Sequence, residues 1–298
     1  MANILPIYKV WGGIFALTSA FMWAFTAILF RRLGDNVSPL GMNLGKGIVA
    51  VICLGISLLL TDTSSVTNRT FLFLGISGLL GITFGDTFFF MALIRLGPRL
   101  ALILTTLIPV VTVFLAVLIL HERQSLISWL GILFTLLGVA WVVCERAPVG
   151  YRINNWKAGI KYGVLTVLCC ALGVIFCKMV IESTSALKAT FIRQIWGVMG
   201  LILWGLMGFH LKIWLKPLTN PALLKNLFFA SFIGTFLGTW LCLLALKYTD
   251  ASIATILNST SPLFILPLAF FILKEKISFR AIIGSIIAIA GVGLIFSG

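Results

Sequence analysis

The feature that most constrains this sequence is a series of ten apolar runs separated by short connections. A helix of about 20 residues crosses the roughly 30 Å hydrocarbon layer of a bilayer, and these runs have that length. They are continuous rather than alternating, which excludes a membrane β-barrel. Charged residues, Pro or Gly bound them, and they predict transmembrane helices at residues 10–30, 40–60, 71–94, 100–120, 126–144, 158–180, 188–209, 226–247, 251–273 and 279–297. The predicted fold class is therefore an all-α integral membrane protein.

The composition agrees with this fold class. Of the 298 residues, 60% are hydrophobic and 10% are charged, whereas soluble domains carry about 25% charged residues. The first run follows Lys9 and continues into Arg31 and Arg32 without a small-residue cleavage site, so we expect a retained span and not a signal peptide. The net charge of +14 does not indicate a nucleic-acid partner, because the basic residues stand singly or in pairs at the ends of apolar runs.

An internal repeat divides the chain into two halves. Residues 80–143, laid without gaps on residues 233–296, are identical at 17 of 64 positions. Gly81, Gly85 and Pro109 align with Gly234, Gly238 and Pro262, respectively. We expect a first five-helix repeat at 10–144, a connecting loop at 145–157 and a second five-helix repeat at 158–297. An odd number of helices per repeat inserts the second copy in the opposite sense, which places a site near midplane at the repeat interface.

Membrane orientation stays open at this point. The side that holds both predicted termini carries 6 Lys and Arg residues near span ends, and the other side carries 14. By the positive-inside rule this count predicts that both termini lie outside.

Several small or helix-breaking residues recur in the same order in both halves. In the first half they are Ala92-Leu93, Ala101, Pro109, Glu122, Gly131 and Gly138-Val139. This duplicated pattern resembles the EamA family of the drug/metabolite transporter superfamily. The resemblance implies ten helices, transport of amino acids, metabolites, nucleotide sugars or toxic organic compounds, and frequent coupling to protons. It also implies cytoplasmic termini, against the charge count.

Asp86 is the acidic residue that lies deep within an apolar run, in the segment Gly85-Asp86-Thr87. A carboxylate at that depth is expensive, and its protonation can be linked to substrate binding and proton coupling. The alternative is a structural pair with Lys46 or a helix cap. Its counterpart in the second half is Thr239, so this feature is asymmetric.

Lys46 and Arg193 occupy equivalent places, seven residues into the second helix of each half and about 10 Å along its axis. One interpretation is that both side chains extend to the lipid headgroups. The other is that they face a cavity from opposite sides and hold an anionic group such as a carboxylate, for which Arg is the better bidentate donor.

Pro109 and Pro262 are predicted to kink two helices near midplane, where a gate could bend. Beside them lie Thr106 and Asn258, which we predict either to contact substrate or to satisfy backbone groups freed by the kinks. Trp240 is a further candidate, as a wall for apolar or aromatic cargo, although a membrane Trp more commonly faces lipid. Glu122 and Glu275 stand between cations at helix junctions and are predicted to cap helices or form loop salt bridges.

The leading functional prediction is a secondary active transporter, and specifically an exporter, of a small organic metabolite, amino acid or drug-like solute. The sequence contains no motif for ATP binding, metal binding or hydrolysis, so we expect that the protein is not an enzyme and binds no metal or cofactor. The predicted partners are the solute, protons as a coupling ion and the lipid bilayer of a bacterial inner membrane. A monomer contains both halves and is sufficient, and a dimer is compatible with the sequence. A passive channel of the same fold is the alternative, followed by a membrane-embedded enzyme or assembly factor.

Overall fold

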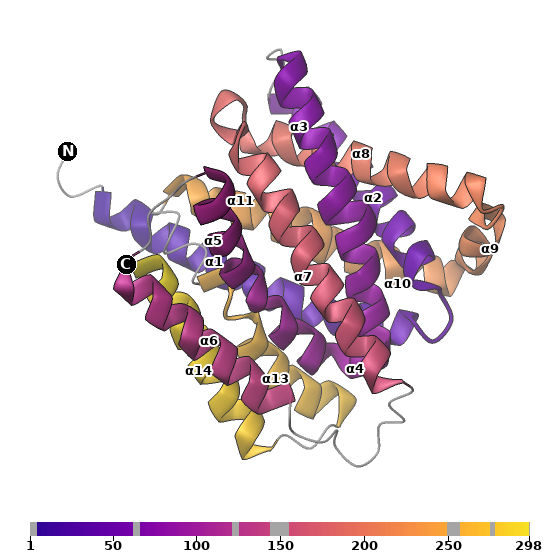
Figure 1. Cartoon of the computed structure of the whole chain (residues 1–298). Helices are drawn as coiled ribbons and strands as arrows, with labels where there is room; N and C mark the ends of the chain where they lie inside the picture. The colour runs from indigo at the N-terminus through magenta and orange to yellow at the C-terminus, as the bar shows by residue number, and fades with distance from the viewer. Residues whose placement is uncertain are drawn as a thin grey trace.

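The computed structural model describes residues 5–61, 66–120, 125–143, 155–248, 257–274 and 278–297, and this part of the chain is helical without a β-strand (Figure 1). The helices of the first half are α1 (Leu5–Leu33), α2 (Pro39–Thr61), α3 (Asn68–Gly78), α4 (Thr87–Thr105), α5 (Leu107–Leu120) and α6 (Leu126–Val143). Those of the second half are α7 (Trp156–Lys178), α8 (Ala186–Met207), α9 (Leu211–Leu215), α10 (Pro221–Ala230), α11 (Gly238–Tyr248), α13 (Ser261–Leu273) and α14 (Phe279–Ser297).

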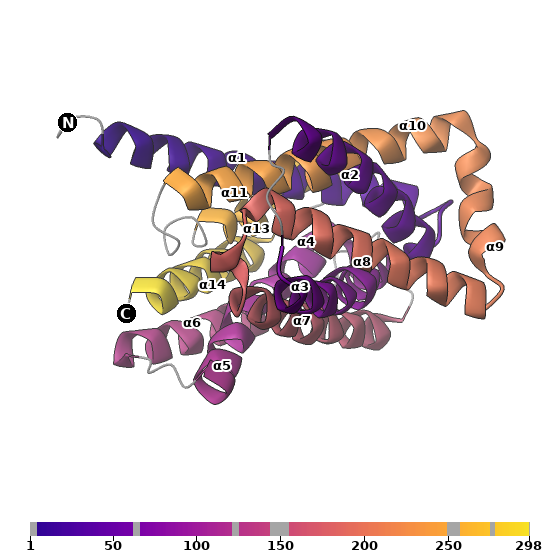
Figure 2. The same ribbon diagram turned by 90° about the horizontal axis from the view of Figure 1, so that it is seen from above.

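Four short segments of other helical types link these helices. Two are 3₁₀ turns, η2 (Ile181–Ser183) and η3 (Lys216–Thr219). The other two are π-helical, η1 (Leu79–Asp86) and η4 (Ser231–Leu237), and each continues without a break from the helix before it into the helix after it. The short α9 lies across the direction of α8 and α10 at one end of the molecule (Figure 2).

Six helical stretches are long and apolar enough to cross a membrane: 10–33, 39–60, 68–105, 156–178, 186–207 and 221–242. Four shorter apolar helices add to them, at 107–119, 126–142, 261–273 and 279–294. Large apolar side chains such as Leu59, Leu118 and Phe271 are exposed on the outer faces, as expected of lipid-facing helices. The structure therefore has the surface of a multi-pass membrane protein.

The helical path breaks at Gly97 and Pro98, between two predicted spans. Gly97 has φ 80° and ψ 166°, a conformation that is open to Gly and strained for other residues. Pro98 provides no backbone N–H, and it disfavours a helical conformation at the residue before it. The connection predicted over 95–99 is therefore present, and it is formed by this single non-helical residue.

The two halves interlock instead of lying side by side. From the first half, α1 and α2 pack on η4 of the second, and from the second half α7 and α8 pack on α3 and η1 of the first. Likewise α1 packs on α13, and α7 packs on α5. The first two helices of each half thus pack on the third helix of the other half, which places η1 and η4 at the interface of the halves.

The last helices of the two halves, α6 and α14, form the most extensive helix pair in the structure (Figures 1 and 2). Small residues allow the backbones to touch: a Cβ added to Gly138 would meet the backbone of Ala288, and one added to Gly291 would meet Thr135. The Thr135 hydroxyl lies 2.9 Å from Gly131 O on its own helix and 3.4 Å from Ala288 O across the pair.

Candidate functional site

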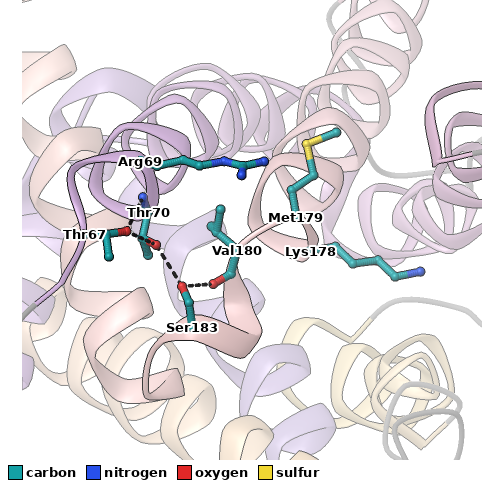
Figure 3. Close-up of a pocket in the computed structure, with 7 residues that line it drawn as sticks. All are labelled: Thr67, Arg69, Thr70, Lys178, Met179, Val180 and Ser183. Carbon is teal, nitrogen blue, oxygen red and sulfur yellow. Dashed lines mark hydrogen bonds between the residues drawn. The ribbon is translucent and has the colours of Figure 1, made fainter.

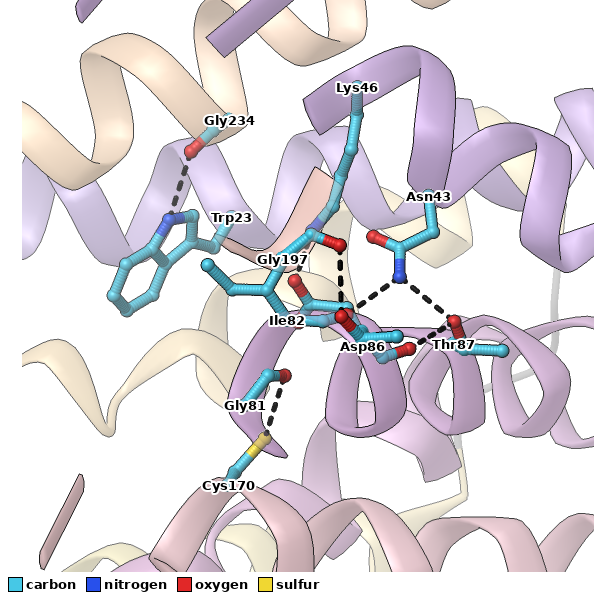
Figure 4. Close-up of polar contacts among 11 residues, drawn as sticks. Trp23, Asn43, Lys46, Gly81, Ile82, Asp86, Thr87, Cys170, Gly197 and Gly234 are labelled. Carbon is cyan, nitrogen blue, oxygen red and sulfur yellow. Dashed lines mark hydrogen bonds and ion pairs between the residues drawn. The ribbon is translucent and has the colours of Figure 1, made fainter. Parts of the chain in front are cut away.

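An ion pair between Lys46 and Asp86 lies among the apolar helices (Figure 4). Lys46 Nζ on α2 lies 2.6 Å from Asp86 Oδ2, the last residue of η1, and 5.2 Å from the ring centre of Phe90. Lys46 is 8% exposed. The interpretation that its side chain extends to the headgroups is therefore wrong, because the nearby carboxylate and ring hold it inward. The side chain of Asp86 is 28% exposed, so its carboxylate is partly accessible.

Asn43 positions η1 beside this pair, and the sequence analysis missed it. It lies on α2 three residues before Lys46, on the same helix face. Its Nδ2 donates to Ile82 O at 2.7 Å and to Thr87 Oγ1 at 2.9 Å, while the Thr87 hydroxyl donates to Thr83 O. An amide in the otherwise apolar α2, on the face that carries Lys46, was the signal that could have identified it.

Arg193 approaches the same region from α8. Its Nη2 lies 3.3 Å from the position that a Cβ on Gly81 would take, so the guanidinium faces η1. Its Nε is buried, and within the described residues it has no hydrogen-bond partner. The Cys170 thiol of α7 also lies at Gly81, 3.9 Å from its carbonyl oxygen, so α7 and α8 approach η1 at the same residue. The site is thus formed by α2, η1, α7 and α8, that is, by both halves.

The π-helical segments occupy corresponding positions of the two repeats. In η1, Gly81 O accepts a long hydrogen bond of 3.9 Å from Cys170 Sγ on α7. In η4, the aligned Gly234 O accepts a bond of 3.1 Å from Trp23 Nε1 on α1 (Figure 4). A π-helical turn shifts the backbone hydrogen bonds, and such turns are frequent at functional sites. The first helix of each half therefore binds a carbonyl of the π-helical segment in the other half.

Glycines allow these segments to approach α7 and α1 closely. A Cβ added to Gly85 would lie 2.7 Å from Cys170 Sγ, and one added to Gly238 would lie 2.9 Å from Trp23 Nε1. The sequence repeat identified these glycines, but it could not show the π-helical geometry, because such a turn leaves no apolar pattern of its own.

The second-half candidates have separate surroundings. Asn258 Nδ2 lies 3.2 Å from Cys242 Sγ, and its Oδ1 is buried without a hydrogen-bond partner in the described part of the chain. Trp240 is 42% exposed, with its ring beside Phe236. Thr106 is buried and donates its hydroxyl to Ile103 O at 2.7 Å, which matches the interpretation that it satisfies its own backbone.

The predicted mid-helix positions of Pro109 and Pro262 are wrong. Pro109 is the third residue of α5, and Pro262 is the second residue of α13. Each therefore lies in a first helical turn, where a missing N–H costs no hydrogen bond, just after a break in the helical path at Thr106 or Thr260. The prolines mark these breaks without kinking a continuous helix. Their role in gating remains a prediction.

A separate pocket of about 370 Å³ lies at one end of α3 and α7 (Figure 3). It is lined by Thr67, Arg69, Thr70, Lys178, Met179, Val180 and Ser183. Its hydroxyls bond to one another, with Thr70 Oγ1 2.8 Å from Ser183 Oγ, so they join α3 to η2 across the two halves. None of the predicted site residues lines this pocket, and we regard it as a structural junction.

Glu122 and Glu275 lie outside the described residues. Within the described part, no group of three His, Cys, Asp or Glu side chains is arranged to hold a metal ion.

Comparisons with known proteins give consistent likenesses. The family model of the EamA-like transporter family matches residues 10–144 and 157–297. An uncharacterized transporter of Archaeoglobus fulgidus is 26% identical over 286 residues, which cover 95% of this chain and 96% of the relative. A WAT1-related protein of Arabidopsis thaliana is 25% identical over 136 residues, 46% of this chain and 36% of the relative. A solved crystal structure with 14% identity shares the fold, with a TM-score of 0.65 and 95% coverage of both chains.

Proposed function

Because the chain belongs to the EamA-like transporter family, we propose that it is a secondary transporter that exports a small organic solute by alternating access between its two halves. The observation that carries this proposal is the Lys46–Asp86 ion pair, placed among apolar helices where both halves meet. Charges at such depth are costly in a membrane protein, and they mark substrate or ion pathways.

The proposed topology is ten spans in two inverted five-helix repeats. The six long apolar stretches and four shorter apolar helices supply candidates for these spans, once 68–105 is divided at Gly97. The start of α1 and the end of α14 lie toward the same side of the molecule, in line with an even number of crossings (Figures 1 and 2). We place the protein in a bacterial inner membrane, with a monomer as a sufficient unit.

Asp86 is the proposed site of proton coupling. Ionised, it holds the Lys46 ammonium on α2; protonated, it loses the negative charge and the ion pair opens. Lys46 is its ion-pair partner, and Arg193 on α8 and Cys170 on α7 lie along the same π-helical segment, at Gly81. Opening of the pair at the end of η1 would loosen α2 from this π-helical segment, and closing of the pair would fix the two again. A proton would thereby alternate the site between two arrangements.

Counterflow in proteoliposomes tests the proposed function. Vesicles with purified protein are loaded with one member of a panel of amino acids, organic acids or aromatic cations, and uptake of the same labelled compound is followed. A transporter gives saturable uptake that unlabelled compound inside the vesicle accelerates. A passive channel gives flux that neither saturates nor responds to internal compound, and that result would overturn the alternating-access proposal.

A further inference from the structure

The charges of the site do not balance within the described residues. Lys46 is neutralised by Asp86, whereas the described residues supply no ion pair for its repeat counterpart Arg193, and the buried Nε of Arg193 has no hydrogen-bond partner among them. The sequence repeat explains the difference, because the position that corresponds to Asp86 in the second half is Thr239. The duplication therefore provides two cations and a single carboxylate.

The Arg193 side chain is only partly covered by the rest of the protein. Arg193 is half-buried, and its guanidinium faces Gly81, which has no side chain to cover it. The Asp86 side chain, five residues further along η1, is also partly exposed. A buried charge without a partner is costly, and an anion that approaches along η1 would remove this cost.

We infer that the transported solute carries a carboxylate and that Arg193 binds it. The inference rests on the proposed transport function and names its substrate class. The planar guanidinium offers paired N–H donors that match the two oxygens of a carboxylate. The Asp86 carboxylate competes with the solute carboxylate for Lys46. When Asp86 is protonated, the Lys46 ammonium is free to bind the solute as a second cation. Neutral and cationic solutes gain no favourable electrostatic interaction from these two cations.

Pairs of compounds that differ in one charge test the inference. Purified protein is titrated with propionate and propionamide, benzoate and benzamide, and N-acetylglycine and its amide, and thermal stability is followed. We expect at least one carboxylate to stabilise the wild type more than its amide. In Arg193→Gln this preference is lost, with apparent affinity lower by about tenfold or more, while Arg193→Lys retains part of it. Lys212→Gln, which removes an exposed cation on α9, leaves the preference unchanged.

The comparison within the wild type needs no variant, so a poorly folded Arg193→Gln does not remove the test. A wild type that responds to every amide as strongly as to its acid overturns the inference, and so does an unchanged preference in a folded Arg193→Gln. Counterflow in the same preparation separates the two proposals. Arg193-dependent carboxylate binding without saturable exchange contradicts the transport proposal and leaves the anion site supported. If neutral or cationic compounds show saturable exchange and Arg193→Gln leaves it unaffected, the anion site is contradicted and the transport proposal is supported.

Discussion

At the scale of single residues, Lys46 and Asp86 depend on each other. Each would be an unpaired charge among apolar helices if its partner were removed, and the Phe90 ring and Asn43 hold the surrounding geometry. The exposed Arg31–Asp35 pair at the end of α1 has a similar distance, 2.8 Å, but the Asp35 side chain is 66% exposed. Water solvates the Asp35 carboxylate without its partner, so the same geometry contributes much less stability there.

This difference predicts a non-additive mutational cycle. Lys46→Met or Asp86→Asn alone should lower stability by about 1–3 kcal/mol, whereas the double variant should cost less than the sum of the two. Thermal unfolding in detergent measures all three variants, with Asp35→Asn as the matched exposed control, which we expect to change stability by less than about 1 kcal/mol. Additive effects of the two single changes would show that the ion pair does not stabilise the fold.

Sequence reasoning reached some residues of the site and missed others. Asp86 and Lys46 stand out because charges are rare in apolar helices, and their pairing was one of the alternatives considered. The absence of an ion-pair partner for Arg193 among the described residues could not be predicted, because hydropathy does not show which helix faces approach each other. Cys170 and Trp23 were missed as partners of η1 and η4, since their role depends on carbonyls displaced by π-helical turns.

At the scale of helical elements, the π-helical segments η1 and η4 are the feature shared by both halves. In η1 both aligned glycines, Gly81 and Gly85, lie within the segment, whereas in the second half Gly234 lies within η4 and Gly238 directly follows it. Each segment packs against the first helix of the other half. A segment with shifted hydrogen bonds can return to a regular α-helix by a small rearrangement, which suits a hinge between two arrangements of the halves.

Close contact at these glycines predicts position-dependent effects. Gly85→Ala places a methyl group 2.7 Å from Cys170 Sγ and should cost about 1–3 kcal/mol of stability and slow transport, because η1 can no longer approach α7. Gly293→Ala on α14 is the matched control: its Cβ meets nothing within 4 Å, so it should be neutral or stabilising by up to about 1 kcal/mol. Thermal unfolding and exchange rates check both variants, and equal behaviour of the two would contradict the packing role of Gly85.

The break in the helical path predicts a second backbone effect. Gly97 adopts φ 80° and ψ 166°, a region that is nearly restricted to Gly, so Gly97→Ala should lower stability by about 1–3 kcal/mol without touching the ion pair. Thermal unfolding of this variant measures the loss. We expect the Lys46–Asp86 mutational cycle, repeated in the Gly97→Ala background, to give the same result as in wild type. Wild-type stability in Gly97→Ala would mean that this residue is not held in the left-handed region.

At the scale of the whole molecule, the halves exchange helices, and this makes the interface between them the centre of the protein. Apolar periodicity and the repeat predicted most helices to within a few residues, because each apolar run must bury or face lipid along its length. They did not predict the exchange of α1 and α2 for α7 and α8, which depends on which helix faces are complementary. The continuous course of α3, η1 and the first part of α4 was predicted as one span at 71–94, but its π-helical turn was not, because such a turn interrupts no apolar run.

Membrane orientation is a prediction at this scale. Reporter tags at the two chain ends should be equally accessible from one side, because the ten proposed spans would return the chain to the side where it began. The family pattern predicts cytoplasmic tags, and the excess of Lys and Arg on the opposite side predicts external ones. Tags on opposite sides would contradict an even number of spans.

The most direct test of the account is proton-driven transport by Asp86→Asn, compared with Asp35→Asn and wild type in proteoliposomes. The account predicts that a pH gradient drives accumulation of solute in wild type and Asp35→Asn. It predicts that Asp86→Asn loses this accumulation while it retains exchange at equal pH, because the site still binds solute but no longer exchanges a proton. Full pH-driven accumulation by Asp86→Asn would contradict the assignment of proton coupling to the Lys46–Asp86 pair.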